Sequence, residues 1–163
     1  MITRNELALL LTYHPDGGYF IWNVSRGGIK AGSTAGTPTC HGYVQIKVNG
    51  KFYKAHRLAW LAMTGEDLGD AEIDHINGDG FDNTWSNLRK ATRCQNACNQ
   101  GVKKSNKSGF KGVSFDRRRN AWIARVRDGG KRIWVGSFPS PEEAAAAYQQ
   151  AAKSVHGEFF RAA

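Results

Sequence analysis

The first third of the chain has the short apolar runs that are typical of β-strands. Strand propensity is high at residues 19–22 and 43–48, and an Asn-Gly pair joins the second run to residues 52–54. Asn-Gly between two such runs is a strong signal of a tight β-hairpin. Residues 27–36 are rich in Gly, Ser and Thr, so we expect a loop there. Residues 1–55 are therefore predicted to be β-rich.

Two helices are predicted in the middle of the chain. Residues 56–63 place apolar side chains at helical spacing, and Gly65 follows as a stop signal. Thr92 is suited to cap a second helix from residue 93 to about residue 100. A polar, basic stretch without apolar periodicity follows at residues 99–109, and we expect it to be a linker between domains.

The last third of the chain predicts a three-stranded sheet followed by one helix. Strand-like runs occupy residues 110–115, 122–127 and 132–138, with turn signals between them. Ser140 is suited to cap the helix, with Pro and two acidic residues in its first turn, and Gly157 supplies its end.

Strand alternation separates the two faces of this sheet. The face toward the helix should carry the apolar residues Trp122, Ala124, Val126, Ile133 and Val135. The opposite face should carry Ile123, Arg125, Arg127, Arg132 and Trp134. Because arginines beside an exposed tryptophan are unusual on a sheet without a ligand, the second face is a candidate nucleic-acid surface.

Composition indicates a folded protein. Forty per cent of the 163 residues are apolar, with five Trp and eight Phe, which is enough for packed cores. No apolar run approaches the ~18 residues of a membrane span. The apolar run at residues 7–11 is much too short for a signal peptide. Three cysteines without framework spacing suit reduced thiols in a cytoplasm.

The net charge of +9 is unevenly distributed along the chain. Residues 1–55 carry six Lys/Arg and two Asp/Glu, residues 56–100 carry four and seven, and residues 101–163 carry thirteen and five. The two basic end segments can neutralise the phosphates of a nucleic acid, while the acidic central segment attracts a cation. The alternative is that the basic runs only make the protein soluble.

The acidic centre contains four polar residues that suit phosphodiester hydrolysis. Asp74 and His75 end a short apolar strand, and Asn87 and Asn96 follow at intervals that a hairpin and a helix could bring together. A carboxylate supplies a metal ligand and an imidazole supplies a base.

This constellation resembles the HNH endonucleases of the ββα-metal group, most closely the phage-type members. The resemblance implies that His75 is the general base, that Asn87 orients it and steadies the hairpin, and that Asp74 and Asn96 are metal ligands. Asn96 departs from the histidine that many members have. An amide oxygen is a harder ligand than imidazole, so one Mg²⁺ or Mn²⁺ per active site is expected.

Residues 109–160 resemble the plant ethylene-response-factor (Apetala-type) DNA-binding domain. The matching segments are 109–113, 122–128, 132–138 and 142–148, whereas residues 116–120 lack the usual tryptophan of the family. The candidate DNA-binding residues of the whole chain are Arg89, Lys111, Arg118, Arg119, Arg125, Arg127, Arg132 and Trp134. For Arg89, packing across the hairpin is an equal alternative.

Other candidate sites carry weaker signals. Three loop residues resemble a calcium loop slightly, without its full spacing: Asp79, Asp82 and Asn83. Four residues could form a zinc site, without a paired CxxC: Cys40, His41, Cys94 and Cys98. His56 is expected to be a buried structural residue at a helix start, with support of the active site as the alternative.

The expected fold class is α+β, in two domains. Residues 1–100 should form the nuclease domain, with a β-rich part at 1–55 and a helix and ββα-metal motif at 56–100. Residues 101–108 should be a basic linker. Residues 109–163 should form the ERF-like domain, a three-stranded antiparallel sheet packed on one helix.

The expected function is metal-dependent DNA endonuclease activity with sequence or site preference. A phage or mobile-element origin of the homing type is expected, and the alternative is a sequence-specific DNA-binding regulator with an inactive nuclease domain. An RNA-directed nuclease is disfavoured because the sheet suits B-form DNA. We expect double-stranded DNA as the partner, no membrane, a monomer or weak dimer, and a cytoplasmic location, in a bacterial host if phage-encoded.

Overall fold

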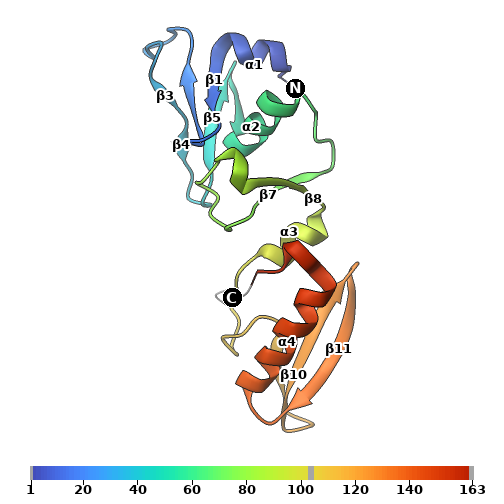
Figure 1. Cartoon of the computed structure of the whole chain (residues 1–163). Coiled ribbons are helices and arrows are strands. Elements are labelled where there is room, and N and C mark those ends of the chain that lie inside the picture. The colour runs from blue at the N-terminus through green and yellow to red at the C-terminus, as the bar shows by residue number, and fades with distance from the viewer. Residues whose placement is uncertain (1, 103–104, 162–163) are drawn as a thin grey trace. The chain divides into compact units, whose positions relative to one another are not determined.

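The computed structural model describes residues 2–102 and 105–161. The chain divides into two compact units, residues 1–91 and 92–163, which are described separately below (Figure 1). Both units combine helices with antiparallel sheets, so the α+β class is confirmed. None of the described helices is long and apolar enough to cross a membrane.

The first unit opens with a helix that the sequence analysis missed. Helix α1 (Arg4–Leu10) begins with a capping box, in which Thr3 and Glu6 each satisfy a backbone N–H of the other. The Thr-x-x-Glu spacing is the signal that could have revealed it. A three-stranded sheet follows in the order β1 (Leu11–His14), β2 (Tyr19–Trp22) and β3 (Thr34–Ala35). Strand β3 occupies part of the predicted loop.

A second sheet of the first unit contains the predicted hairpin. Its strands are β4 (Thr37–Pro38), β5 (Val44–Val48) and β6 (Lys51–Lys54), all antiparallel. The turn residues Asn49 and Gly50 have φ of 49° and 79°. Two positive φ values are what a type I′ hairpin turn requires, which explains the Asn-Gly pair.

Helix α2 (Ala55–Thr64) packs its apolar side into the core of the first unit. It ends at Gly65, whose φ of 73° is left-handed, as the stop signal predicted. Helix α2 also contacts β7 (Glu72–His75), which pairs with β8 (Leu88–Ala91) after the short 3-10 helix η1 (Trp85–Asn87). This hairpin carries three of the four predicted site residues.

The second unit contains the predicted sheet and helix. Strands β9 (Val113–Asp116), β10 (Ala121–Asp128) and β11 (Lys131–Phe138) form an antiparallel sheet with β10 in the centre. Helix α4 (Pro141–His156) lies against it, capped by Ser140 and ended by Gly157, and the 3-10 helix η2 (Gly157–Phe159) follows (Figure 1). These capping predictions are confirmed.

Helix α3 (Arg93–Asn99) also groups with the second unit. Thr92 caps it in a capping box with Gln95, as expected for that residue. The units thus divide between residues 91 and 92, whereas the nuclease domain was expected to end at residue 100. The nuclease domain boundary at residue 100 stays a prediction.

The described residues of the predicted linker that precede the sheet form hydrogen bonds. Residues 103–104 lie outside the described residues. Beyond them, Asn106 donates to the Phe110 carbonyl and the Ser108 hydroxyl lies 2.8 Å from the Val113 carbonyl. These bonds form a turn where an early start of the first strand was expected, so β9 begins only at Val113.

The core of the second unit is built from small side chains. Its buried members are Val113, Ala124, Val126, Ala144, Ala145, Tyr148 and Ala152. Ile133 was expected to be buried against the helix, and this prediction is wrong. It pairs with Val126 and so lies on the predicted face, but it is 41% exposed because β11 is an edge strand. Ile123, expected on the polar face, is buried within the central strand.

Gly112 makes the closest approach in this core. Its φ is +72°, and a Cβ there would lie 2.1 Å from Cε2 of Tyr148. We predict that Gly112→Ala destabilises the protein by roughly 2–4 kcal/mol, from left-handed strain and overpacking together. Urea unfolding of the full chain measures this difference.

Gly130→Ala is the matched control for that substitution. Gly130 has φ +86° but no heavy atom within 4 Å of the added Cβ. It should therefore show only the strain, about 1–2 kcal/mol. Equal losses for both variants would contradict the packing argument.

Candidate functional site

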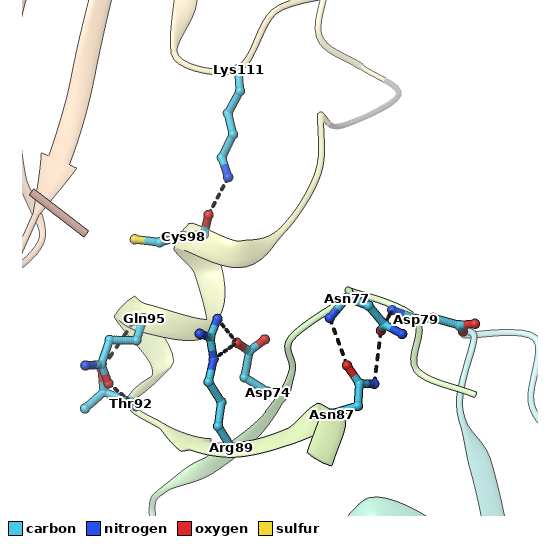
Figure 2. A network of polar contacts seen from close by, with 9 residues as sticks. All are labelled: Asp74, Asn77, Asp79, Asn87, Arg89, Thr92, Gln95, Cys98 and Lys111. Atoms are coloured by element: carbon cyan, nitrogen blue, oxygen red, sulfur yellow. Dashed lines mark hydrogen bonds and ion pairs between the residues drawn. The ribbon is translucent and has the colours of Figure 1, made fainter. Parts of the chain in front are cut away.

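The β7–β8 hairpin fixes the buried carboxylate of the candidate site. Asp74 and Arg89 are paired residues of the two strands, and Asp74 is only 3% exposed. Arg89 donates to Oδ2 of Asp74 from Nε at 2.8 Å and from Nη2 at 2.7 Å (Figure 2). Of the two alternatives for Arg89, the structure thus provides packing across the hairpin, and its DNA contact stays a prediction.

His75, the last residue of β7, is buried, and its ring is hydrogen-bonded to Asn83. Its Nε2 lies 3.1 Å from Oδ1 of Asn83, while Nδ2 of Asn83 donates to the Phe81 carbonyl. Because this amide nitrogen is used by Phe81, the Asn83 oxygen is assigned as acceptor from Nε2, which corresponds to the neutral tautomer with its proton on Nε2. This tautomer has the basic nitrogen that proton abstraction requires.

The environment keeps His75 neutral. Burial lowers the pKa of His75, against the opposing effects of the Asn83 hydrogen bond and the Asp74 carboxylate. A neutral imidazole at neutral pH can accept a proton from water.

Asn83 is the ring-orienting residue that the sequence analysis missed. It is 1% exposed, and its carbonyl accepts a 2.6 Å hydrogen bond from the Tyr13 hydroxyl. A Cβ on Gly18 would lie 2.5 Å from the backbone nitrogen of Thr84, so only glycine permits this approach of the two segments. Asn83 lies in a polar loop without periodicity, and its contact depends on residues about 70 positions away.

Asn87 holds the loop between β7 and β8. Its Oδ1 accepts from the Asn77 backbone at 2.9 Å, and its Nδ2 donates to Oδ1 of Asn77 (Figure 2). Nδ2 of Asn87 also donates to the Asp82 carbonyl. The loop that presents Asn83 to His75 is therefore tied to the end of η1 by this amide. The catalytic role assigned to Asn87 stays a prediction.

Two acidic residues of the loop cap its turns. Asp79 accepts from the Phe81 backbone at 2.9 Å, and Asp82 accepts from the Thr84 backbone and hydroxyl.

Within residues 2–102 and 105–161, no group of three or more His, Cys, Asp or Glu could hold a metal ion. The calcium and zinc alternatives therefore find no support in the described residues.

His56, at the start of α2, lies against the candidate base. Its ring is perpendicular to that of His75, at 86° and 5.0 Å between centroids, and it also contacts Tyr43. It is 5% exposed, and its Nδ1 has no hydrogen-bond partner among the described residues. Burial lowers the pKa of His56 to about 3, and the neighbouring His75 adds to that shift.

The outer face of the C-terminal sheet gathers cations around Trp134. This side chain is 45% exposed, with the guanidinium of Arg119 4.9 Å and that of Arg125 5.6 Å from the ring centroid. Arg127 and Arg132 form an exposed pair across β10 and β11. Exposed Arg118 lies in the preceding turn, its backbone N–H bonded to Asp116.

Two further predicted site residues, Lys111 and Asn96, belong to the second unit. Lys111 is half-buried, and its Nζ donates to the Cys98 carbonyl of α3 (Figure 2), so it has a protein partner where a DNA contact was expected. Asn96 lies on α3, in the second unit, whereas Asp74, His75 and Asn87 lie in the first. Its participation with them stays a prediction.

Comparison with known proteins assigns the hairpin region to a family. Residues 53–98 match the sequence model of HNH endonucleases. Protein 3.8 of Escherichia phage T7 is 35% identical over 114 residues, 68% of this chain and 93% of that protein. An uncharacterised HNH endonuclease of Acanthamoeba polyphaga mimivirus is 35% identical over 64% of this chain and 54% of its own length. The chain belongs to the HNH endonuclease family.

This HNH endonuclease also carries an AP2 domain, matched at residues 108–158. Dehydration-responsive element-binding protein 2C of Arabidopsis thaliana is 46% identical over 54 residues, 32% of this chain and 16% of that protein. A solved structure of the HNH homing endonuclease I-HmuI, which concerns DNA binding and cleavage, aligns with 89% of this chain. The alignment includes 76% of the I-HmuI chain, at 21% sequence identity and a TM-score of 0.45.

The buried His56 generates a prediction about pH. Its pKa of about 3 lies below the ordinary 6.5, so between these values the unfolded chain binds a proton that the folded chain does not. Stability should therefore fall as pH drops from about 6.5 toward about 3. From pH 7 to pH 5 the loss through one such group is roughly 2 kcal/mol.

His56→Phe should remove that share of the pH dependence while keeping the ring packing. A smaller slope should remain, because burial also lowers the pKa of His75. Urea unfolding at the two pH values measures the difference, with His41→Phe, at an exposed loop position, as the control. An unchanged slope in His56→Phe would show that His56 does not titrate in this way.

Proposed function

We propose that the protein is a divalent-metal-dependent DNA endonuclease with site preference, of phage or mobile-element origin. His75 acts as the general base, and Asp74 and Asn96 are metal ligands. The observation that carries this proposal is the buried His75, whose Nε2 is hydrogen-bonded to Asn83 and whose pKa is lowered by burial. Such an imidazole serves proton transfer, and the family match supplies the class of reaction.

The donor atoms of the proposed ligands fit Mg²⁺ or Mn²⁺. A carboxylate and an amide supply oxygens, which these hard cations prefer. Mg²⁺ commonly uses only one or two protein carboxylates together with waters and phosphate oxygens, so a small ligand set suffices. When bound, the cation would neutralise phosphate charge and stabilise the departing oxygen.

The residues of the chain divide the remaining work. His75 takes the proton of the attacking water, while the hydrogen bond from Asn83 positions its ring. Arg89 holds the Asp74 carboxylate in place. The neutral His56 ring, packed at 86° to His75, limits rotation of the base. Each of these residues either positions a reacting group or transfers a proton, and both contributions accelerate phosphodiester hydrolysis.

The AP2 domain is proposed to direct cleavage by binding double-stranded DNA with the outer face of its sheet. Arg119 and Arg125 flank the exposed Trp134 there. A sheet can enter the major groove, where arginine reads guanine edges or holds phosphates. The thirteen Lys/Arg of residues 101–163 support the electrostatic part of binding.

One observation favours the alternative, a DNA-binding regulator with an inactive nuclease domain. The guanidinium of Arg89 lies on Oδ2 of Asp74, and a positive charge there opposes a cation. Incubation of plasmid DNA with Mg²⁺, Mn²⁺ or EDTA separates the two functions. Binding without cleavage in either metal would support the regulator.

We predict that His75→Ala lowers the cleavage rate by about 10²–10⁴ while DNA affinity stays nearly unchanged. The base takes part in the reaction and does not neutralise phosphates. Single-turnover cleavage and equilibrium binding measure the two quantities. His41→Ala, an exposed histidine outside the site, is the control and should cut at the normal rate. Normal cutting by His75→Ala would refute its assignment as base.

We predict that Trp134→Ala and Arg125→Ala weaken DNA binding. Loss of a base-reading arginine should cost ~1–3 kcal/mol at one position of the site, whereas loss of a phosphate contact should weaken all sequences and reduce the salt slope by about one. Binding of the full chain at two salt concentrations distinguishes these cases. Lys153→Ala, exposed on α4, is the control. Unchanged affinity in both variants would place the DNA surface elsewhere.

A further inference from the structure

Helix α3 needs support from outside itself. It has seven residues and only one buried side chain, that of Asn99. Helices shorter than about 12 residues are marginal in water, so caps and tertiary contacts must hold it. Its first turn has the capping box of Thr92 and Gln95 (Figure 2). Its last turn has no basic residue and ends at Gln100 in extended conformation.

Lys111 of the AP2 domain supplies a donor at that end of α3. Its Nζ donates to the carbonyl of Cys98, within the last turn (Figure 2). The last four carbonyls of a helix lack partners within it, and a cation there is favoured by the helix dipole. Burial lowers the pKa of Lys111, so the side chain gives up hydration to make this contact. The buried position is consistent with a structural role for this lysine.

His156, the last residue of α4, contacts the same residue of α3. Its Nδ1 lies 3.4 Å from Sγ of Cys98. Both the main chain and the side chain of Cys98 are thus engaged by the AP2 domain, from two separate segments. Two contacts from different directions fix the position of a short helix better than either alone.

Part of α3 faces a cavity. A cavity of about 480 Å³ lies in the second unit, lined by residues of α3 and by Tyr148, Val155 and Phe159, among others. A helix that rests beside a cavity gains little from close packing. The contacts from Lys111 and His156 at the rim of this cavity contribute to the docking, and removal of either should loosen α3.

We propose that Lys111 and His156 are positioning residues that hold α3, and with it Asn96, so that the AP2 domain supports the nuclease reaction as well as DNA binding. This inference rests on the proposed function, in which Asn96 is a metal ligand. Lys111 then serves as an anchor of the helix, in place of the DNA contact suggested by its sequence.

The experiment compares Lys111→Met and His156→Phe in the full chain, with Lys153→Met as the matched control. Hydrogen exchange of the α3 amides should accelerate about tenfold in each anchor variant, the effect of losing one hydrogen bond. The Mg²⁺ concentration for half-maximal cleavage should rise severalfold, while DNA affinity stays within about twofold. Lys111→Arg, which keeps a cationic donor, should restore most of the protection. Circular dichroism checks that each variant is folded.

The two readouts separate the parts of the inference. Unchanged α3 exchange in both anchor variants would overturn the docking, whether or not the protein cleaves DNA. Faster exchange with an unchanged Mg²⁺ requirement would overturn the link to the reaction. Weaker DNA binding by Lys111→Met, with α3 still protected, would return Lys111 to the DNA surface. Absence of cleavage by the unsubstituted chain would overturn the proposed function itself, before any variant is compared.

Discussion

The ion pair of Asp74 and Arg89 is the interaction on which the first unit's site depends. A carboxylate that is 3% exposed is costly unless a charge and hydrogen bonds compensate it, and both Nε and Nη2 of Arg89 do so. Because the partners face each other in the β7–β8 register, a slipped hairpin would break this ion pair. The ion pair therefore specifies the register that ends β7 at His75 and begins β8 at Leu88.

The loop between these strands provides the second constraint. Its acidic and amide side chains are used as caps and cross-links, with Asn77 and Asn87 bonded at two points. This network holds Asn83 in a buried position where its amide reaches His75. A cluster that resembles a cation site in sequence thus acts as the scaffold of the candidate base. The carboxylates of Asp79 and Asp82 serve the backbone of the loop.

Function and packing divide the chain at different places. The HNH match continues to residue 98, whereas the first compact unit ends at residue 91. Helix α3 is the segment between these limits, and it is held by Lys111 and His156 of the AP2 part. In a fusion of this kind, one helix can belong to the nuclease by sequence and to the DNA-binding module by packing. A substitution in the DNA-binding module can then change the position of a nuclease residue.

The sequence by itself determined the elements and chemistry that local patterns encode: the Asn49-Gly50 hairpin, the stop at Gly65, the caps of α4 and the motif of Asp74 and His75. Turn and cap geometry depends on neighbouring residues, so it can be predicted from short segments. The capping box of α1 could also have been predicted from the sequence, but it was missed. Only the tertiary structure decided that Asn83 meets His75, that Lys111 turns toward α3 and that Ile133 is left at an open edge. These outcomes depend on contacts between segments that are distant in sequence and on which strand lies at the edge of its sheet. A local sequence pattern predicts neither the contacts nor the strand order.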